Sequence, residues 1–216
     1  MNNKPNSVKG FQIFPCSVYT IEKPEFLDIT REVSKKFLDE RKETLDLNPN
    51  FPVFMTDNMF NDSELLDFGK FVSQTAWEIL KDQGYLMDVF QTYFTEMWVQ
   101  EHHKGSSMER HIHGNGAILS GFYFLNCPPE ANIVFHDPRD AKVITSLPEK
   151  DCSQGTQASN MIHFNANNGL LVFANSWLPH SFNKNIEDTP LTFIHFNIAV
   201  TPIPQEVCLQ PNVEIV

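Results

Sequence analysis

Short runs rich in β-branched and aromatic residues crowd the second half of the sequence, and turn residues separate them. The separators are built from Asn, Asp, Pro and Gly, as in NCPPE, DPRD and NANNG, which is the composition of tight turns. The runs that we predict to be strands cover residues 116–126, 131–137, 160–166, 169–176 and 191–200. Many short strands joined by such turns predict a fold that is mainly β, an antiparallel sandwich or jelly roll, with α-helices flanking it.

The first half of the sequence instead carries two stripes typical of amphipathic helices. Apolar residues recur at three- and four-residue spacing from Phe26 to Phe37 and again from Leu65 to Ile79, so each stripe forms one face of a helix. Gly84 predicts the end of the second helix, and the period then changes to two, as in a strand. On this pattern one side of the strand carries Tyr93, Met97 and Val99, and the other carries Phe94 and Trp98.

Length and charge bound the organisation and the partners of the chain. We expect the 216 residues to form one domain, with 1–90 as a helical and extended flank, 91–200 as a jelly-roll core and 201–216 as a C-terminal tail. The segment 140–159 is polar and without a period, which predicts a mobile loop or a lid. A net charge of -11 without a basic run disfavours nucleic acid. With no run of 18 apolar residues and no signal sequence, we expect a cytoplasmic protein that does not contact membranes.

Three of the eight histidines form a pattern that favours a metal site. His111 and His113 are two residues apart, just before the predicted strand 116–126, and a period of two places both imidazoles on one face of an extended segment. His180, in the motif SWLPHSF, lies where a later strand ends, and a jelly roll can bring such strands face to face. Three imidazoles leave the other coordination positions of a metal open, as an oxygen-activating Fe(II) site requires. A catalytic zinc site uses similar ligands, so the pattern alone leaves the metal undecided.

Four segments carry a wider likeness: WVQEHHKGSSMERHIHGNGAILSGFYFLNCP, IVFHDPR, GLLVFANSWLPHSF and FIHFNIAV. In this order, over about residues 90–200, they resemble the 2-oxoglutarate and Fe(II)-dependent oxygenase superfamily, and within it a poorly characterised group of oxygenases with an H-x-H motif. The resemblance implies a double-stranded β-helix, a cupin-like form of jelly roll, with Fe(II) at one open end. It implies that His111 is the first metal ligand, that His180 is the distal one, and that His113 stands where the superfamily usually has a carboxylate.

The resemblance also implies 2-oxoglutarate as the cosubstrate. The superfamily generally binds the second carboxylate of 2-oxoglutarate with an Arg or Lys on the strand after the distal His, because these cations pair with carboxylates. In this sequence Pro190, Leu191 or Thr192 occupies that place, and the strand carries no cation.

Because this strand carries no cation, three other residues are candidates to bind the cosubstrate. If Asn197 faces inward, it shares its side of the strand with Leu191, Phe193 and His195 by alternation, and it can hydrogen-bond a ligand. Arg139 is the only arginine after residue 110. Tyr123 lies in the strand after H-x-H, where the related enzymes often use a tyrosine hydroxyl.

The implied activity is that of a 2-oxoglutarate-dependent dioxygenase, which hydroxylates an unidentified substrate and releases succinate and CO2. The metal and the cosubstrate carry the reactive chemistry, so we expect no catalytic residue beyond the metal ligands. We expect a small molecule or a peptide as substrate, and the Phe-rich helical half offers a face for a homodimer. Two alternatives stay open: a three-histidine cupin-type dioxygenase that does not use 2-oxoglutarate, and a jelly-roll binding or assembly module without enzymatic activity.

Overall fold

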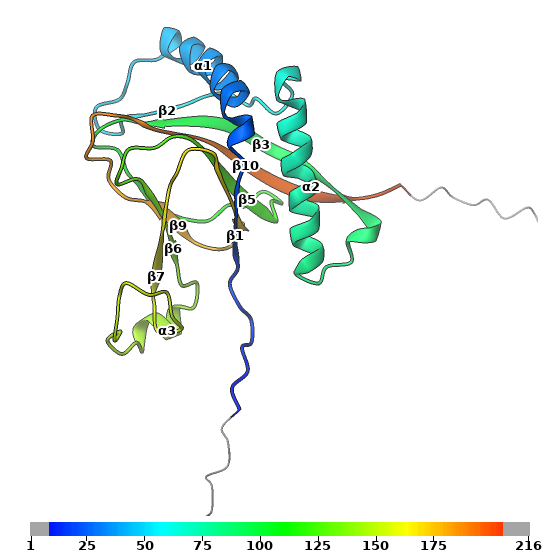
Figure 1. The fold of residues 1–216 in the computed structure, drawn as a ribbon, viewed down its shortest axis with the longest axis vertical. Helices are drawn as coiled ribbons and strands as arrows, with labels where there is room; N and C mark the ends of the chain where they lie inside the picture. The colour runs from blue at the N-terminus through cyan, green and yellow to red at the C-terminus, as the bar shows by residue number, and fades with distance from the viewer. Residues whose placement is uncertain (1–8, 205–216) are drawn as a thin grey trace, which may run out of the picture.

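Two antiparallel β-sheets form the body of the computed structural model, which describes residues 9–204. The six-stranded sheet runs in the order β1 (Val18–Glu22), β8 (Leu170–Asn175), β5 (Leu119–Asn126), β10 (Leu191–Pro202), β3 (Phe90–His102) and β2 (Val53–Met55). The four-stranded sheet runs in the order β4 (Met108–His111), β9 (His180–Phe182), β6 (Asn132–His136) and β7 (Met161–Asn165). Figure 1 shows them as the two layers of a jelly roll, a double-stranded β-helix, which confirms the predicted fold class.

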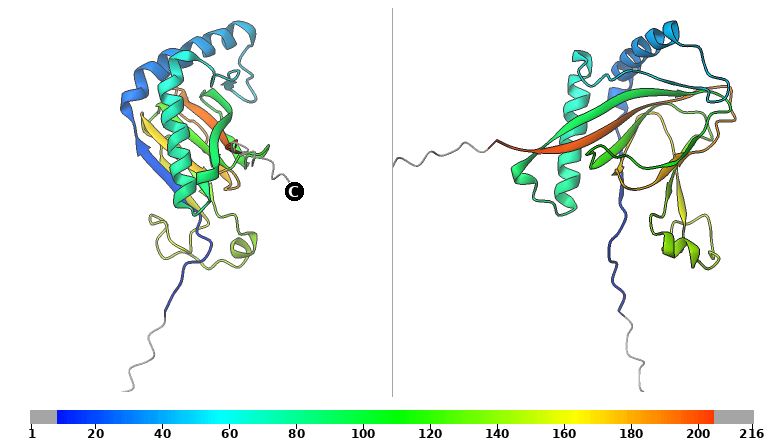
Figure 2. Two further views of the ribbon diagram at one scale, coloured as in Figure 1. Left: turned by 90° about the vertical axis from the view of Figure 1, so that its right-hand side faces the viewer. Right: turned by 180° about the vertical axis from the view of Figure 1, so that it is seen from behind.

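Both predicted helices form, and they cover the outer face of the six-stranded sheet (Figure 2). Val33 of the first helix and Phe68 and Val72 of the second are buried against strand residues on that face, because their spacing keeps them on one side of each helix. The helical elements are η1 (Pro24–Phe26), α1 (Leu27–Thr44), η2 (Ser63–Leu65), α2 (Leu66–Asp82), η3 (Met87–Val89) and α3 (Asp140–Ile144). Within the described part of the chain, no helix is long and apolar enough to cross a membrane.

Aromatic side chains fill the space between the two sheets and form an inner core. Strand alternation directs Phe122 of β5 and Phe193 of β10 into this space, where Phe182 of β9 meets them with ring centroids 5.4 and 4.7 Å away. Leu191 of β10 lies in the same core. The inward face predicted for β10 is therefore the face that the structure has.

A β-bulge in β3 changes which of its side chains face the inner core. Residues 197 and 198 of β10 are consecutive, yet they pair with Glu96 and Phe94, so Thr95 has no partner on β10. One extra residue shifts the alternation of a strand by one. Phe94 therefore packs with Met97 against the helices, and the prediction that Phe94 and Met97 point to opposite sides was wrong.

Strand ends from both sheets meet at one end of the jelly roll. In the four-stranded sheet β4 ends at His111, whose register partner is His180, the first residue of β9. β6 ends nearby at His136. In the six-stranded sheet β5 begins at Leu119, opposite Asn175, the last residue of β8. The histidines of the predicted metal site therefore lie at the end where these loops leave the sheets.

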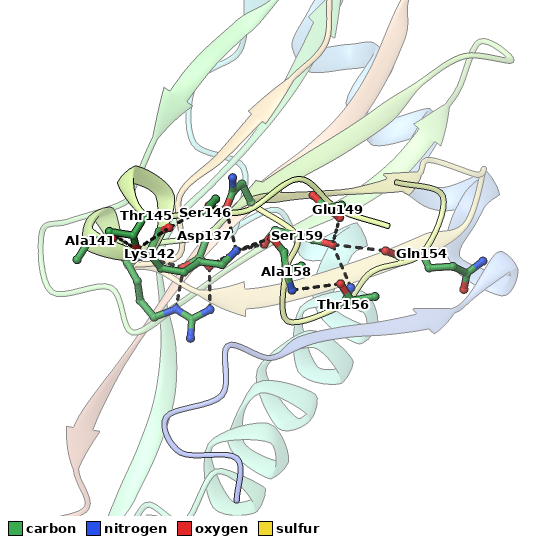
Figure 3. Close-up of polar contacts among 12 residues, drawn as sticks. Asp137, Ala141, Lys142, Thr145, Ser146, Glu149, Gln154, Thr156, Ala158 and Ser159 are labelled. Atoms are coloured by element: carbon green, nitrogen blue, oxygen red, sulfur yellow. Dashed lines mark hydrogen bonds and ion pairs between the residues drawn. The ribbon is translucent and has the colours of Figure 1, made fainter. Parts of the chain in front are cut away.

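Polar contacts connect the segment 140–159 to the end of β6 and link parts of the segment to each other (Figure 3). This is the segment for which we predicted a mobile loop or a lid. The Asp137 carboxylate, at the end of β6, forms ion pairs with Arg139 at 2.8 Å and Lys142 at 3.2 Å. The Lys142 ammonium also donates a hydrogen bond to the backbone carbonyl oxygen of Ser159 at 2.6 Å. Lys142 thus connects the beginning of the segment to its end, and the segment begins with the short helix α3.

Candidate metal centre

The structure brings the three predicted histidines together. His111 and His180 are opposite each other on β4 and β9, and His113 follows in the loop that leads to β5. The backbone N–H of His113 donates to the Ser176 carbonyl oxygen at 2.9 Å, which fixes this loop beside the turn before β9. One nitrogen from each imidazole lies within 4.8 Å of the others. The Nε2 atoms of His113 and His180 are 3.1 Å apart.

Backbone carbonyl groups determine which nitrogen of two of these rings is free to bind an ion. Nδ1 of His111 lies 2.7 Å from the Glu109 carbonyl oxygen, and Nδ1 of His180 lies 3.1 Å from that of Leu178. A carbonyl oxygen only accepts, so each Nδ1 carries the proton and donates. Nε2 then keeps its lone pair in the neutral ring, which is the usual arrangement of a metal-binding histidine.

The third ring is held by an amide and a carboxylate. The amide nitrogen of Asn197 lies 3.4 Å from Nδ1 of His113 and donates a hydrogen bond to the Glu96 carboxylate at 2.8 Å. Glu96 thus places a carboxylate one side chain away from His113. We did not single out Glu96 from the sequence, although alternation places it on the same face of β3 as Trp98, and these two residues pair with Asn197 and His195 of β10.

Burial keeps the imidazoles of His113 and His180 neutral. Desolvation, and secondarily the charge of His111, lowers the pKa of His113 to about 4 and that of His180 to about 3. A neutral ring offers a lone pair to a metal without first losing a proton. Three imidazole nitrogen donors fit a borderline metal such as Fe(II) or Zn(II). The ligands that an iron site needs are therefore present.

Beside the three histidines lies a group of buried polar side chains that have lost water without gaining protein partners. His195 of β10 stacks on His113 with ring centroids 4.5 Å apart, and it contacts the ring of Trp98 at a tilted angle of 60°, also at 4.5 Å between centroids. Neither ring nitrogen of His195 has a hydrogen-bond partner among residues 9–204, nor do Oδ1 of Asn197 and Oγ of Ser120. Ser120 is a residue that the sequence did not draw attention to, and it pairs with Asn197 across β5 and β10.

Tyr123 is not brought to the histidines. Its ring lies between the six-stranded sheet and the helices, 5.0 Å from the ring of Phe68, and its hydroxyl donates to the Lys23 carbonyl oxygen at 2.6 Å. Burial raises its pKa to about 12. Alternation explains the difference, since Phe122 on one side of Tyr123 faces the inner core and Tyr123 faces the outer one.

Arg139 is also separate from the three histidines. Its guanidinium forms two hydrogen bonds to the Asp137 carboxylate, from Nε at 2.9 Å and from Nη2 at 2.8 Å. The side chain is 58% exposed and lines a cleft of about 760 Å³ between residues 11–16 and the loop after β6. Of the residues predicted to bind the cosubstrate, Asn197 alone lies beside the triad.

Comparison with known proteins finds a family model that matches the part of the chain that carries this arrangement. Residues 96–197, from the bulge in β3 to the inward Asn197, match the family described as Putative 2OG-Fe(II) oxygenase. No curated protein matches the sequence.

Several solved structures share the fold. AviO1 from Streptomyces viridochromogenes Tue57 aligns with a TM-score of 0.60 and 12% identity, over 88% of this chain and 93% of that one. The prolyl hydroxylase of Trichoplax adhaerens, solved with a peptide of hypoxia inducible factor, gives 0.53 and 10%, over 83% and 82%. The epimerase SnoN, solved with Fe3+, alpha ketoglutarate and nogalamycin RO, gives 0.56 and 12%, over 93% and 88%. At such identities the likeness concerns the fold.

Proposed function

We propose that this chain, whose residues 96–197 belong to the Putative 2OG-Fe(II) oxygenase family, hydroxylates a substrate at a centre formed by His111, His113 and His180 and releases succinate and CO2. Enzymes of this family use Fe(II) and 2-oxoglutarate. The observation that carries the proposal is the convergence of three imidazole nitrogens within 4.8 Å. Two of these rings have their tautomer fixed by backbone carbonyl groups, as metal ligands require.

In this proposal the protein holds and orients groups and does not transfer protons. Bound Fe(II) and 2-oxoglutarate supply the oxidising chemistry. His111 and His180 present Nε2 from one sheet, and His113 presents its ring from the loop that connects β4 to the other sheet. Phe122 and Phe182 keep the space behind the centre dry. We therefore assign no catalytic residue beyond the metal ligands.

A small molecule or a peptide is the proposed substrate. The related folds include an enzyme solved with a peptide and one solved with nogalamycin RO. A net charge of -11 argues against nucleic acid. A cytoplasmic location, the absence of membrane contact, a homodimer and the division into a flank up to residue 90, a core up to residue 200 and a tail belong to the same proposal. Residues 205–216 of that tail lie outside the described residues.

The test is anaerobic. Fe(II) is added to the purified full chain, and 2-oxoglutarate is then titrated in. A weak charge-transfer band in the visible range is expected, because 2-oxoglutarate chelates ferrous iron in this class of enzyme. H111A and H180A are expected to lose iron binding. H163A is the matched control, since His163 is an exposed histidine on β7 away from the triad.

One result would favour the second candidate function. A three-histidine dioxygenase that does not use 2-oxoglutarate agrees with His113 in the place of the carboxylate and with the lack of a Lys or Arg on β10. It predicts iron binding that depends on His111 and His180 with no band on addition of 2-oxoglutarate. Iron binding that survives H111A and H180A would contradict both functions.

A further inference from the structure

Three neighbouring side chains on the inner face of the six-stranded sheet hold four polar atoms without partners. Ser120 is 0% exposed, His195 is 1% exposed and Asn197 is 3% exposed. Ser120 and Asn197 are register partners on β5 and β10, and His195 precedes Asn197 by two residues on the same face. The unpartnered atoms are Oγ of Ser120, Nδ1 and Nε2 of His195, and Oδ1 of Asn197.

Such a concentration of unpartnered atoms points to a ligand. Folded proteins pair nearly all of their buried polar groups, and a group left unpaired inside the protein is destabilising. The other buried side-chain atoms without partners in residues 9–204 belong to Ser34, Arg41 and Ser106, with one atom at each position. Only at the candidate centre do several of them gather.

The position of this group relative to the triad narrows the kind of ligand. The ring of His195 lies 4.5 Å from that of His113 between centroids, and the Asn197 amide nitrogen lies 3.4 Å from Nδ1 of His113. The unpartnered atoms therefore lie next to one of the candidate metal ligands, so a small molecule bound to the metal has polar groups beside it on this side of His113. The deeper part of the inner core is closed to a charged group, because Leu191 and Phe193 occupy it.

The donors and acceptors among the unpartnered atoms further limit which chemical group of a ligand can bind there. A carboxylate has acceptor atoms only and needs donors. The Ser120 hydroxyl and the one N–H of a neutral His195 ring are donors without acceptors. Oδ1 of Asn197 is an acceptor and cannot bond a carboxylate, while its amide nitrogen already donates to Glu96.

We propose that Ser120 and His195 bind the second carboxylate of 2-oxoglutarate, in the role that a cation has in the wider superfamily. The Ser120 hydroxyl and one His195 N–H donate to its two oxygens. Asn197 has a different part in this arrangement, since it positions His113. The inference rests on the proposed function, because it assigns the binding of that function's cosubstrate.

Uncharged donors bind a carboxylate less strongly than a guanidinium does. The protein should therefore prefer 2-oxoglutarate over 2-oxopentanoate, which has the same chelating end and no second carboxylate, by a moderate factor of about tenfold. That factor is expected to disappear when one of the two donors is removed.

The experiment compares the dissociation constants of the two acids. The Fe(II)-loaded full chain is titrated anaerobically with each acid, and the charge-transfer band is followed. In S120A the Kd of 2-oxoglutarate is expected to rise about tenfold, while the Kd of 2-oxopentanoate and that of Fe(II) stay unchanged. H195F keeps an aromatic ring on His113 and removes the N–H, and it is expected to behave like S120A. S106A is the matched control, because Ser106 is a buried serine without a hydroxyl partner in the loop before β4.

Several outcomes would overturn the assignment. Equal Kd values for the two acids in the unchanged protein, or a rise in both values in S120A, would show that Ser120 does not bind the second carboxylate. A selective rise in the 2-oxoglutarate Kd in R139A, with S120A unaffected, would transfer the role to Arg139. These results leave the proposed function standing, whereas the lack of a band with either acid in iron-loaded protein contradicts the function itself.

Discussion

The Nε2 atoms of His113 and His180 face each other at 3.1 Å, although 67 residues separate them in the chain. The His180 Nε2 has no proton in the neutral ring, because its Nδ1 donates to the Leu178 carbonyl oxygen. When no ion is present, the Nε2–H group of His113 donates a hydrogen bond to the Nε2 atom of His180. An ion that binds both rings takes the place of that proton, so metal and proton compete for this pair of atoms.

The hydrogen bond between Asn197 and Glu96 should affect iron affinity. E96Q keeps the size of the side chain and removes the charge that holds the Asn197 amide beside His113. We expect the Kd for Fe(II) to rise about tenfold, because groups that orient metal ligands typically contribute that much to affinity. Anaerobic titration with Fe(II) measures it. E109Q is the control, since only the backbone carbonyl of Glu109 contacts His111, and an equal loss in E109Q would contradict the role of Glu96.

Acid should destabilise the metal-free protein. The folded state holds the pKa of His113 at about 4 and that of His180 at about 3, whereas an unfolded histidine titrates near 6.5. Below about pH 6.5 these histidines are protonated in the unfolded chain and stay neutral in the folded one. The free energy of unfolding therefore falls as the pH drops toward 4. Each histidine contributes a slope of up to about 1.4 kcal/mol per pH unit.

Urea denaturation in the presence of a chelator, from pH 7 to pH 5, measures this slope. H180F is expected to flatten it, because the variant removes one of the depressed groups and keeps an aromatic ring. A free energy of unfolding that stays constant from pH 7 to pH 5 in the unchanged protein would show that these rings are not shielded from protons.

Tyr123 should matter for stability and not for the cosubstrate. Y123F removes the hydrogen bond from the hydroxyl to the Lys23 carbonyl oxygen and leaves the ring packed against Phe68. The expected cost is about 1 kcal/mol of unfolding free energy, with no change in the Kd of 2-oxoglutarate. The opposite pattern, weaker 2-oxoglutarate binding at unchanged stability, would restore the role that the family resemblance implies for this tyrosine.

Asp137 should keep the segment 140–159 in place. Its carboxylate pairs with Arg139 and Lys142, and the hydrogen bond from Arg139 is the main reason why the pKa of Asp137 lies far below its usual range. D137N weakens both contacts, so limited proteolysis is expected to cut within 140–159 several times faster. Iron binding is expected to stay unchanged. D151N removes a carboxylate of the same segment that holds only Ser153, and it should be cut at the original rate.

Local patterns in the sequence were enough to predict most of the elements and the triad. The stripe from Phe26 to Phe37 became α1, and the H-x-H spacing put His111 and His113 side by side. These features depend on the period of a single segment, which the sequence states directly.

Other features depend on how segments meet, and a single segment does not contain them. The face of β5 that points inward is decided by which side the helices cover. Tyr123, which we predicted to bind the cosubstrate, therefore faces the helices, and Ser120, which we did not single out, faces the candidate centre. The outward position of Phe94, beside Met97, needs the bulge at Thr95, which is visible only in the pairing of β3 with β10.

The candidate ligands and the residues behind them come from different layers. His111 and His180 stand on the four-stranded sheet, while His195 and Asn197, which back His113, stand on the six-stranded sheet. The thickness of the aromatic filling between the layers therefore sets the geometry of the centre. A substitution of Phe182 or Phe193, which are not candidate ligands, should alter that spacing. Repacking of the inner core should therefore change the affinity of the centre for a metal.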